Sequence, residues 1–245
     1  MGSVPGPLRA VTFDFWQTLY VPVGGAASRL PALKALLAPR RPDLNEADLE
    51  TAMRAATEEN TRRWRAGEHF GSHGLVAHLV SALSLHLSPT ESEQLLELIE
   101  APPGEGPLPP VPGALAAVHR LHERGLSLGI VSDTGFRPGR VLRRHLAEAG
   151  ILDCFQPKGL AFSDEVGVPK PDPRIFQAAL SGLGVAAEEA VHVGDLKFTD
   201  VAGARGVGMR VIRFTGCADD PEEGPEADAV VSSHAELEGA LDRLQ

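Results

Sequence analysis

Near its start the chain reads Val11-Thr12-Phe13-Asp14-Phe15-Trp16-Gln17-Thr18-Leu19, an apolar run that ends in an aspartate. The pattern predicts a short buried strand, from Leu8 to Asp14, that delivers a carboxylate to the following loop. A carboxylate presented in this way is suited to act as a nucleophile. Two positions beyond it stands Trp16, whose indole N–H donates a hydrogen bond but has no proton to transfer near neutral pH.

The composition limits the class of protein. The 245 residues are 43% hydrophobic and carry a formal net charge of −10, which allows one large domain or a core with a smaller one. An acidic chain is not expected to bind nucleic acid, because phosphate backbones are bound by clustered lysines and arginines. Cys154 and Cys217 form no metal-binding spacing, and there is no signal-peptide pattern or apolar run of membrane length. We expect a cytoplasmic protein with free thiols, whose oligomeric state stays open.

Two segments rich in proline and glycine bracket a candidate second domain. The first is Val21-Pro22-Val23-Gly24-Gly25, and the second runs from Ala101 to Pro112. Between them, apolar residues recur at helical spacing: Leu30, Leu33, Leu36 and Leu37; Leu75, Leu79, Leu83 and Leu87; Leu95, Leu98 and Ile99. We therefore expect an all-helical domain at 21–109, inserted into a core formed by 1–20 and 110–245.

After Pro112, strand and helix patterns alternate, which is typical of an α/β fold with an open parallel sheet covered by helices. Asp172 is placed to cap a helix that starts with Pro173. The other predicted helices are 113–124, 138–149 and 236–244, and the predicted strands are 126–131, 159–162, 190–195, 208–214 and 227–231.

Polar side chains stand at or beyond the ends of several predicted core strands. They are Asp14 with Thr18, Ser132 with Asp133, Lys170, and Asp195 with Asp200. Ligands of an open α/β sheet bind beyond the carboxyl ends of its strands, so we expect these side chains to share one crevice. In order and character they resemble the motifs of the haloacid dehalogenase-like (HAD) hydrolases. The resemblance covers Leu8 to about Tyr20 and Pro112 to the end of the chain, and it implies a Rossmann-like core with 21–109 as a helical cap.

By this resemblance Asp14 is the nucleophile, and Asp14, Asp195 and Asp200 are the candidate ligands of a Mg²⁺ ion. In the family, the position of Trp16 contributes its backbone carbonyl to the metal. Positive charge is needed because a phosphate dianion resists attack by an anionic carboxylate.

The resemblance also implies substrate-binding roles. Lys170 neutralises the region of the nucleophile and a phosphate oxygen, Ser132 donates a hydrogen bond to the phosphate, and Asp133 lies beside it. Thr18 helps to shape the nucleophile loop.

Trp16 leaves the type of reaction open. In the phosphatases of the family, an aspartate at this position protonates the leaving oxygen. In the 2-haloacid dehalogenases a tyrosine stands there, the nucleophile attacks carbon and no metal is needed. This chain departs from that branch at Gly194-Asp195 and Ser132-Asp133. A halide leaves as an anion and would be repelled by carboxylates, so the acidic last motif favours a metal and phosphate.

In a third branch, the phosphonoacetaldehyde hydrolases, a lysine of the cap forms a Schiff base. Lys34 is the only lysine between residues 21 and 109.

We predict a Mg²⁺-dependent phosphatase that acts on a small phosphorylated metabolite through an aspartyl-phosphate. It would act on acyl or aryl phosphates, or take an acid from the cap, where Glu68, His69 and His73 are candidates. A dehalogenase-like hydrolase, and a protein that binds phosphate and metal with little or no turnover, remain alternatives.

Overall fold

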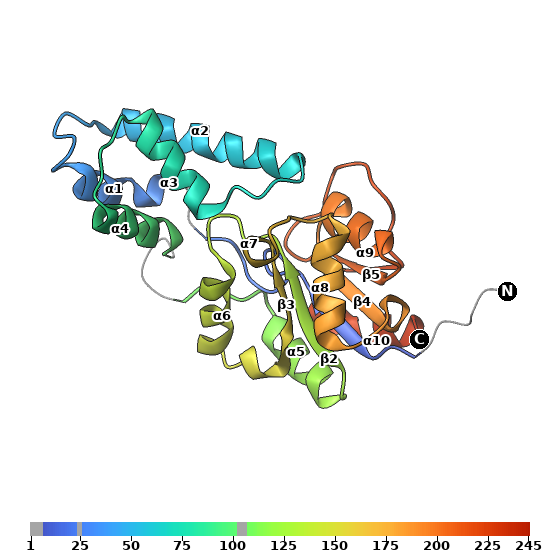
Figure 1. Ribbon diagram of the computed structural model, residues 1–245. Coiled ribbons are helices and arrows are strands. Elements are labelled where there is room, and N and C mark those ends of the chain that lie inside the picture. The colour runs from blue at the N-terminus through green and yellow to red at the C-terminus, as the bar shows by residue number, and fades with distance from the viewer. Residues whose placement is uncertain (1–6, 24–25, 102–106) are drawn as a thin grey trace. The chain divides into compact units, whose positions relative to one another are not determined.

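The computed structural model describes residues 7–23, 26–101 and 107–245, which form two compact units (Figure 1). Of the described residues, 7–22, 108–133 and 143–245 belong to the core unit, and 23, 26–101, 107 and 134–142 belong to the helical unit. The segment 134–142, which the expected division placed in the core, thus groups with the helical unit.

The core unit contains a six-stranded parallel sheet with the order β3-β2-β1-β4-β5-β6. Its strands are β1 (Ala10–Phe13), β2 (Ser127–Ser132), β3 (Phe155–Phe162), β4 (Ala190–Gly194), β5 (Arg210–Phe214) and β6 (Ala229–Val231). The predicted open parallel α/β sheet is confirmed. Because β1 pairs with β2 on one side and β4 on the other, the strand order reverses at β1, where this class of fold binds its ligands.

Helices follow the strands of the core unit. They are α5 (Ala114–Glu123), α6 (Gly139–Glu148), α7 (Ser163–Val166), α8 (Pro173–Leu183), α9 (Ala202–Gly206) and α10 (Leu237–Arg243). Short 3-10 turns lie at η2 (Leu152–Cys154), η3 (Ala187–Glu189) and η5 (His234–Glu236), and a π-helical turn, η4 (Lys197–Val201), precedes α9. The carboxylate of Asp172 caps α8 as predicted, accepting from the backbone N–H of Arg174 at 2.9 Å.

Two boundaries differ from the sequence pattern by more than two residues. Strand β3 begins at Phe155 rather than at residue 159, although Gln156-Pro157-Lys158 is exposed and polar. It is an edge strand, where a proline can be accommodated without loss of a ladder hydrogen bond. The leucine spacing that suggested a helix as far as Leu87 extends beyond α3, which ends at Ala82, because Ser84 takes the left-handed φ of +51°.

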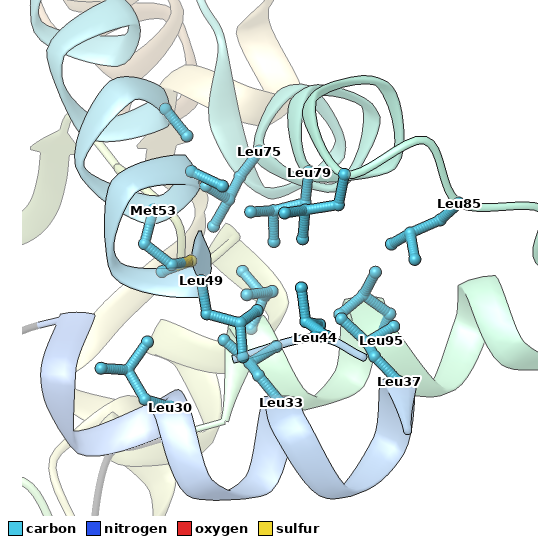
Figure 2. Close-up of a cluster of buried hydrophobic side chains, with 14 residues drawn as sticks. Leu30, Leu33, Leu37, Leu44, Leu49, Met53, Leu75, Leu79, Leu85 and Leu95 are labelled. Atoms are coloured by element: carbon cyan, nitrogen blue, oxygen red, sulfur yellow. The ribbon is translucent and has the colours of Figure 1, made fainter. Parts of the chain in front are cut away.

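The helical unit contains η1 (Ala26–Arg29), α1 (Leu30–Leu37), α2 (Glu46–Arg65), α3 (Gly71–Ala82) and α4 (Pro89–Glu100). Leucines from these helices and their connections point toward one another and form the core of this unit (Figure 2). Ser88 and Glu91 form a capping box at the start of α4, which satisfies its first backbone N–H groups. None of the helices in the described part of the chain combines the length and apolar composition needed to cross a membrane.

Candidate active site

Asp14 and Lys170 meet at the point where the strand order reverses. Asp14 follows β1, and its backbone N–H donates to the carbonyl of Val193 in β4 at 2.8 Å, which fixes the end of β1 against its neighbour. Lys170 follows β3 and α7, and its Nζ lies 2.7 Å from Oδ1 of Asp14 and 2.6 Å from Oδ1 of Asp200. These three side chains are buried, so residues up to 186 positions apart form one desolvated ionic cluster.

Asp195 completes the acidic part of the cluster. Carboxylate oxygens of Asp14, Asp195 and Asp200 all lie within 4.8 Å of one another. With these acids ionised and Lys170 protonated, three negative charges face one positive charge. This balance, together with the all-oxygen ligand set, fits a hard divalent cation such as Mg²⁺.

The pKa values of these groups reflect the same excess of negative charge. Burial raises the pKa of Asp14 to about 6, although Lys170 opposes the shift. Burial, Asp200 and Asp14 together raise the pKa of Asp195 to about 8. Burial disfavours the charge of Lys170, yet Asp14, Asp200 and Asp133 hold its pKa above the usual range, so this side chain stays protonated. A cation beside Asp14 and Asp195 would favour their ionised forms.

Asp200 differs from the other two acids in its hydrogen bonds. Burial opposes its charge, but Lys170 and His192 hold its pKa below the usual range. Its Oδ1 accepts from Lys170 and His192, and its Oδ2 accepts from the backbone N–H of Leu196 at 3.0 Å and the hydroxyl of Thr199 at 3.4 Å. A carboxylate offers about four lone-pair sites, and the protein uses all of them here. In this conformation Asp200 holds Lys170, and its predicted role as a direct metal ligand stays a prediction.

Gly194 allows Asp200 to occupy this position. A Cβ added at Gly194 would lie 2.3 Å from Cγ of Asp200, closer than non-bonded carbons approach. The Gly194-Asp195 pair therefore does two things: the glycine leaves room for one acid, and the next residue supplies another.

The residues that follow β2 support the lysine. Ser132 is fully buried at the end of that strand, and its Oγ lies 3.4 Å from the carbonyl of Asp133. The Oδ1 of Asp133 accepts from the backbone N–H of Lys170 at 2.9 Å. Asp133, predicted as a substrate-binding residue, thus holds the backbone of Lys170 in this structure, and the contact of Ser132 with a phosphate stays a prediction.

The nucleophile loop closes on itself. Gln17 takes a left-handed φ of +58°, and its backbone N–H donates to the carbonyl of Tyr20 at 2.7 Å. Phe15 stacks on Tyr20 and meets the half-buried ring of Trp16 edge-on at 4.9 Å. Thr18 is fully buried, and its hydroxyl finds no hydrogen-bond partner among the described residues, and its role in shaping the loop stays a prediction.

The other candidates lie in the helical unit. Lys34 is exposed on α1, and Glu68, His69 and His73 lie in or near the segment that joins α2 to α3. That Lys34 forms a Schiff base, or that one of the other three residues replaces the missing acid, stays a prediction.

Sequence reasoning missed His192, the central residue of β4. It is fully buried, and its Nε2 lies 2.9 Å from Oδ1 of Asp200, while its Nδ1 lies 2.9 Å from Oγ1 of Thr12. A signal was present, because a histidine in a strand of otherwise buried apolar residues must find polar partners.

Sequence relatives cover part of this chain. A glyceraldehyde 3-phosphate phosphatase of Pyrococcus abyssi is 39% identical over 106 residues, which are 42% of this chain and 42% of that protein. A phosphoserine phosphatase of Thermus thermophilus is 39% identical over 120 residues, or 48% and 46% of the two chains. The matches thus span less than half the length of these curated relatives.

Solved structures resemble nearly the whole fold. A 2-haloacid dehalogenase from Pseudomonas syringae pv. tomato DC3000 gives a TM-score of 0.72 at 26% identity, covering 97% of this chain and 100% of that one. A HAD phosphatase from Thermococcus onnurineus gives 0.63 at 24% identity, covering 96% and 98%, and supports the fold alone. The model of one protein family, the haloacid dehalogenase-like hydrolases, matches residues 8–208. That match includes the first strand, the inserted segment and every residue of the ionic cluster, and the chain therefore belongs to the haloacid dehalogenase-like hydrolases.

Proposed function

We propose that this hydrolase is a Mg²⁺-dependent phosphatase that acts on a small phosphorylated metabolite, with Asp14 as the nucleophile. The observation that carries the proposal is the cluster of Asp14, Asp195 and Asp200 around Lys170, which has more negative than positive charge. Such a site fits a divalent cation and a phosphate held together. Both sequence relatives described above are named as phosphatases of small phosphorylated compounds, which supports the same class of substrate.

The chain's own residues supply the nucleophile and the phosphate contacts. An ionised oxygen of Asp14 attacks phosphorus, the bond from phosphorus to the leaving oxygen breaks, and an aspartyl-phosphate forms. Water then attacks this phosphorus, which releases inorganic phosphate and restores the carboxylate of Asp14. Lys170 keeps its proton throughout and neutralises the phosphate oxygens, while Ser132 donates a hydrogen bond to one of them. Mg²⁺, when bound, supplies the charge that allows two anions to approach each other.

At the position of Trp16, the core unit offers no side chain that could protonate the leaving oxygen. An indole cannot protonate it, and acid catalysis is worth roughly 10²–10⁴-fold. The proposed substrates are therefore acyl or aryl phosphates, whose leaving groups need little protonation, or esters protonated by Glu68, His69 or His73.

Two observations favour a second candidate, a 2-haloacid dehalogenase. The aromatic Trp16 stands at the position where those enzymes have a tyrosine, and one solved dehalogenase gives the TM-score of 0.72. Against it, the clustered carboxylates would repel a departing halide anion. A third candidate, a protein that binds phosphate and metal with little turnover, is favoured by Trp16 alone.

One experiment separates these candidates. Phosphate release from acyl, aryl and alkyl phosphates, and halide release from 2-haloacids, would be measured with and without Mg²⁺. We expect Mg²⁺-dependent phosphate release that disappears in Asp14→Asn. Metal-independent halide release would establish the dehalogenase instead, and binding of phosphate without any release would establish the binding protein.

A further inference from the structure

A ring of side chains starts at Thr12 in β1 and returns to Asp14, directly after β1, and the backbone between these two residues closes it. Oγ1 of Thr12 lies 2.9 Å from Nδ1 of His192, and Nε2 of His192 lies 2.9 Å from Oδ1 of Asp200. The same Oδ1 accepts from Lys170 at 2.6 Å, and Lys170 donates to Asp14, two residues beyond Thr12. No residue in this ring is more than 5% exposed.

His192 is held firmly within the ring. Thr12 and His192 are directly paired across β1 and β4, so their side chains project to the same face of the sheet. The ring of Phe176 meets the imidazole edge-to-face at 5.3 Å and 86°. Because the ionised carboxylate of Asp200 can only accept, Nε2 of His192 carries a hydrogen, and in the neutral ring Nδ1 accepts from the hydroxyl of Thr12. The sheet thus fixes both the position and the tautomer of the imidazole.

We propose that His192 is a positioning residue for the reaction at Asp14: through Oδ1 of Asp200 it sets where the ammonium of Lys170 stands. This inference rests on the proposed function, because it names the residue that holds in place the lysine proposed to neutralise the phosphate. Removing Nε2 frees Oδ1 of Asp200 on one side, so Oδ1 can swing about the anchored Oδ2 and carry Nζ of Lys170 away from Asp14. Backbone N–H and hydroxyl bonds to Oδ2 would keep Asp200 itself in place.

The kinetic test compares two replacements of the histidine. His192→Leu removes the donor, whereas His192→Gln keeps an N–H that can reach Asp200. With an aryl phosphate and saturating Mg²⁺, we expect His192→Leu to lower kcat by about 10–100-fold, the usual effect of groups that hold metal-site residues, with KM changed by less than about threefold. His192→Gln should recover at least half of the lost activity on a logarithmic scale. Thr12→Val, which keeps the shape but removes the partner of Nδ1, should give an intermediate loss.

A matched control is His145, which is also buried but bonds Glu148. His145→Leu should alter thermal stability and leave kcat unchanged. If His192→Leu also shifts only the melting temperature, or if His192→Gln is as inactive as His192→Leu, a merely structural role holds and the proposal fails.

A crystal structure of His192→Leu, or of Thr12→Val if the first does not fold, tests the proposal without turnover. We expect Nζ of Lys170 to move out of hydrogen-bond distance of Asp14, and an unchanged contact would overturn the inference. This measurement stands even if the wild-type protein releases no phosphate, an outcome that would refute the proposed function alone.

Discussion

At the scale of single residues, Trp16 bears on the acid that the proposed reaction needs for its leaving oxygen. It follows Asp14 by two positions and packs edge-on against Phe15. Under the proposed function, it stands where an acid would be needed, and an indole has no proton to transfer. We expect Trp16→Asp to raise kcat/KM for alkyl phosphates by at least tenfold, and by at most the roughly 10²–10⁴-fold that acid catalysis contributes, and to change kcat/KM for aryl phosphates little. The ratio of kcat/KM for the two classes, measured in Mg²⁺, gives the readout.

Trp16→Asn is the matched control, because it introduces a side chain of similar size to aspartate that cannot act as an acid. An equal gain in both variants would show that the bulk of the indole, rather than its lack of a proton, limits the reaction. A folded Trp16→Asp variant that binds Mg²⁺ and gains nothing would rule out both explanations.

The sequence was enough to predict that the acids and the lysine lie together, because each stands beyond a buried strand and the fold brings the ends of these strands together. It could not predict how they divide their roles. That Asp200 uses every lone pair on protein donors, and that Asp133 holds the backbone of Lys170, depends on distances between segments far apart in the chain. His192 was missed because a strand pattern reports burial and says nothing of the partner across the sheet.

At the scale of elements, the packing of α8 on β3 depends on a glycine. A Cβ added at Gly182 would lie 1.7 Å from the carbonyl oxygen of Lys158, a backbone atom that cannot move aside as a flexible side chain can. Alanine would favour the helix by up to about 1 kcal/mol, but overpacking costs about 1–3 kcal/mol or more. We expect Gly182→Ala to lower the free energy of unfolding by about 1–2 kcal/mol, measured by urea denaturation.

Gly206, the last residue of α9, provides the control, because a Cβ placed there meets no atom of another described segment within 4 Å. Gly206→Ala should leave the free energy of unfolding unchanged or raise it by up to about 1 kcal/mol. If Gly182→Ala is as stable as Gly206→Ala, the close approach of α8 and β3 does not limit stability.

Elements were predicted where pattern and boundary signals agreed, as at α8 with its Asp172 cap. They were placed too short or left out where the environment outweighed local composition. The polar start of β3 forms a strand because it lies at the sheet edge, and the segment 197–206 turns helical although Thr199, Asp200 and Gly203 are poor helix formers. In that segment, hydrogen bonds from Leu196 and Thr199 to Asp200 fix the turn.

At the scale of the whole molecule, the chain passes between its two units at more places than the proline-rich connectors. It enters the helical unit again directly after Asp133 and leaves it after Leu142. Within that unit, Arg140 pairs with Glu100, whose buried carboxylate also accepts from Ser72 at 2.8 Å. The sequence could not indicate this, because the partners are 40 residues apart and Arg140 lies in a typical core helix pattern.

We expect Arg140→Ala to lower the free energy of unfolding by about 1–3 kcal/mol, because it leaves a buried carboxylate short of a partner. Adding Glu100→Gln should recover part of the loss in a thermal or urea titration. Arg40→Ala breaks the more exposed pair with Glu91 and should cost less than about 1 kcal/mol. Equal losses in the two single variants would contradict the importance of burial.

The charge of the active site should also link stability, pH and metal. Burial raises the pKa of Asp14 to about 6 and that of Asp195 to about 8, from an ordinary value of 3.8. Without metal, the folded protein therefore binds protons that the unfolded chain has released, so this contribution to stability is greatest at low pH and is lost as pH rises through about 6 and then 8. The lowered pKa of Asp200 acts only below this range.

Mg²⁺ reverses this trend, because it binds ionised carboxylates and so competes with their protons. At one fixed Mg²⁺ concentration, we expect the rise in melting temperature to grow between about pH 6 and pH 8. At a concentration a hundred times the Kd for pH 8, the stabilisation at that pH should reach about 2.7 kcal/mol. Asp195→Asn, which removes the acid with the higher pKa, should lose most of the metal effect and flatten the pH dependence of the metal-free protein. A Mg²⁺ effect of the same size at both pH values, or one that survives in Asp195→Asn, would place the metal away from these carboxylates and remove the main support for a phosphatase.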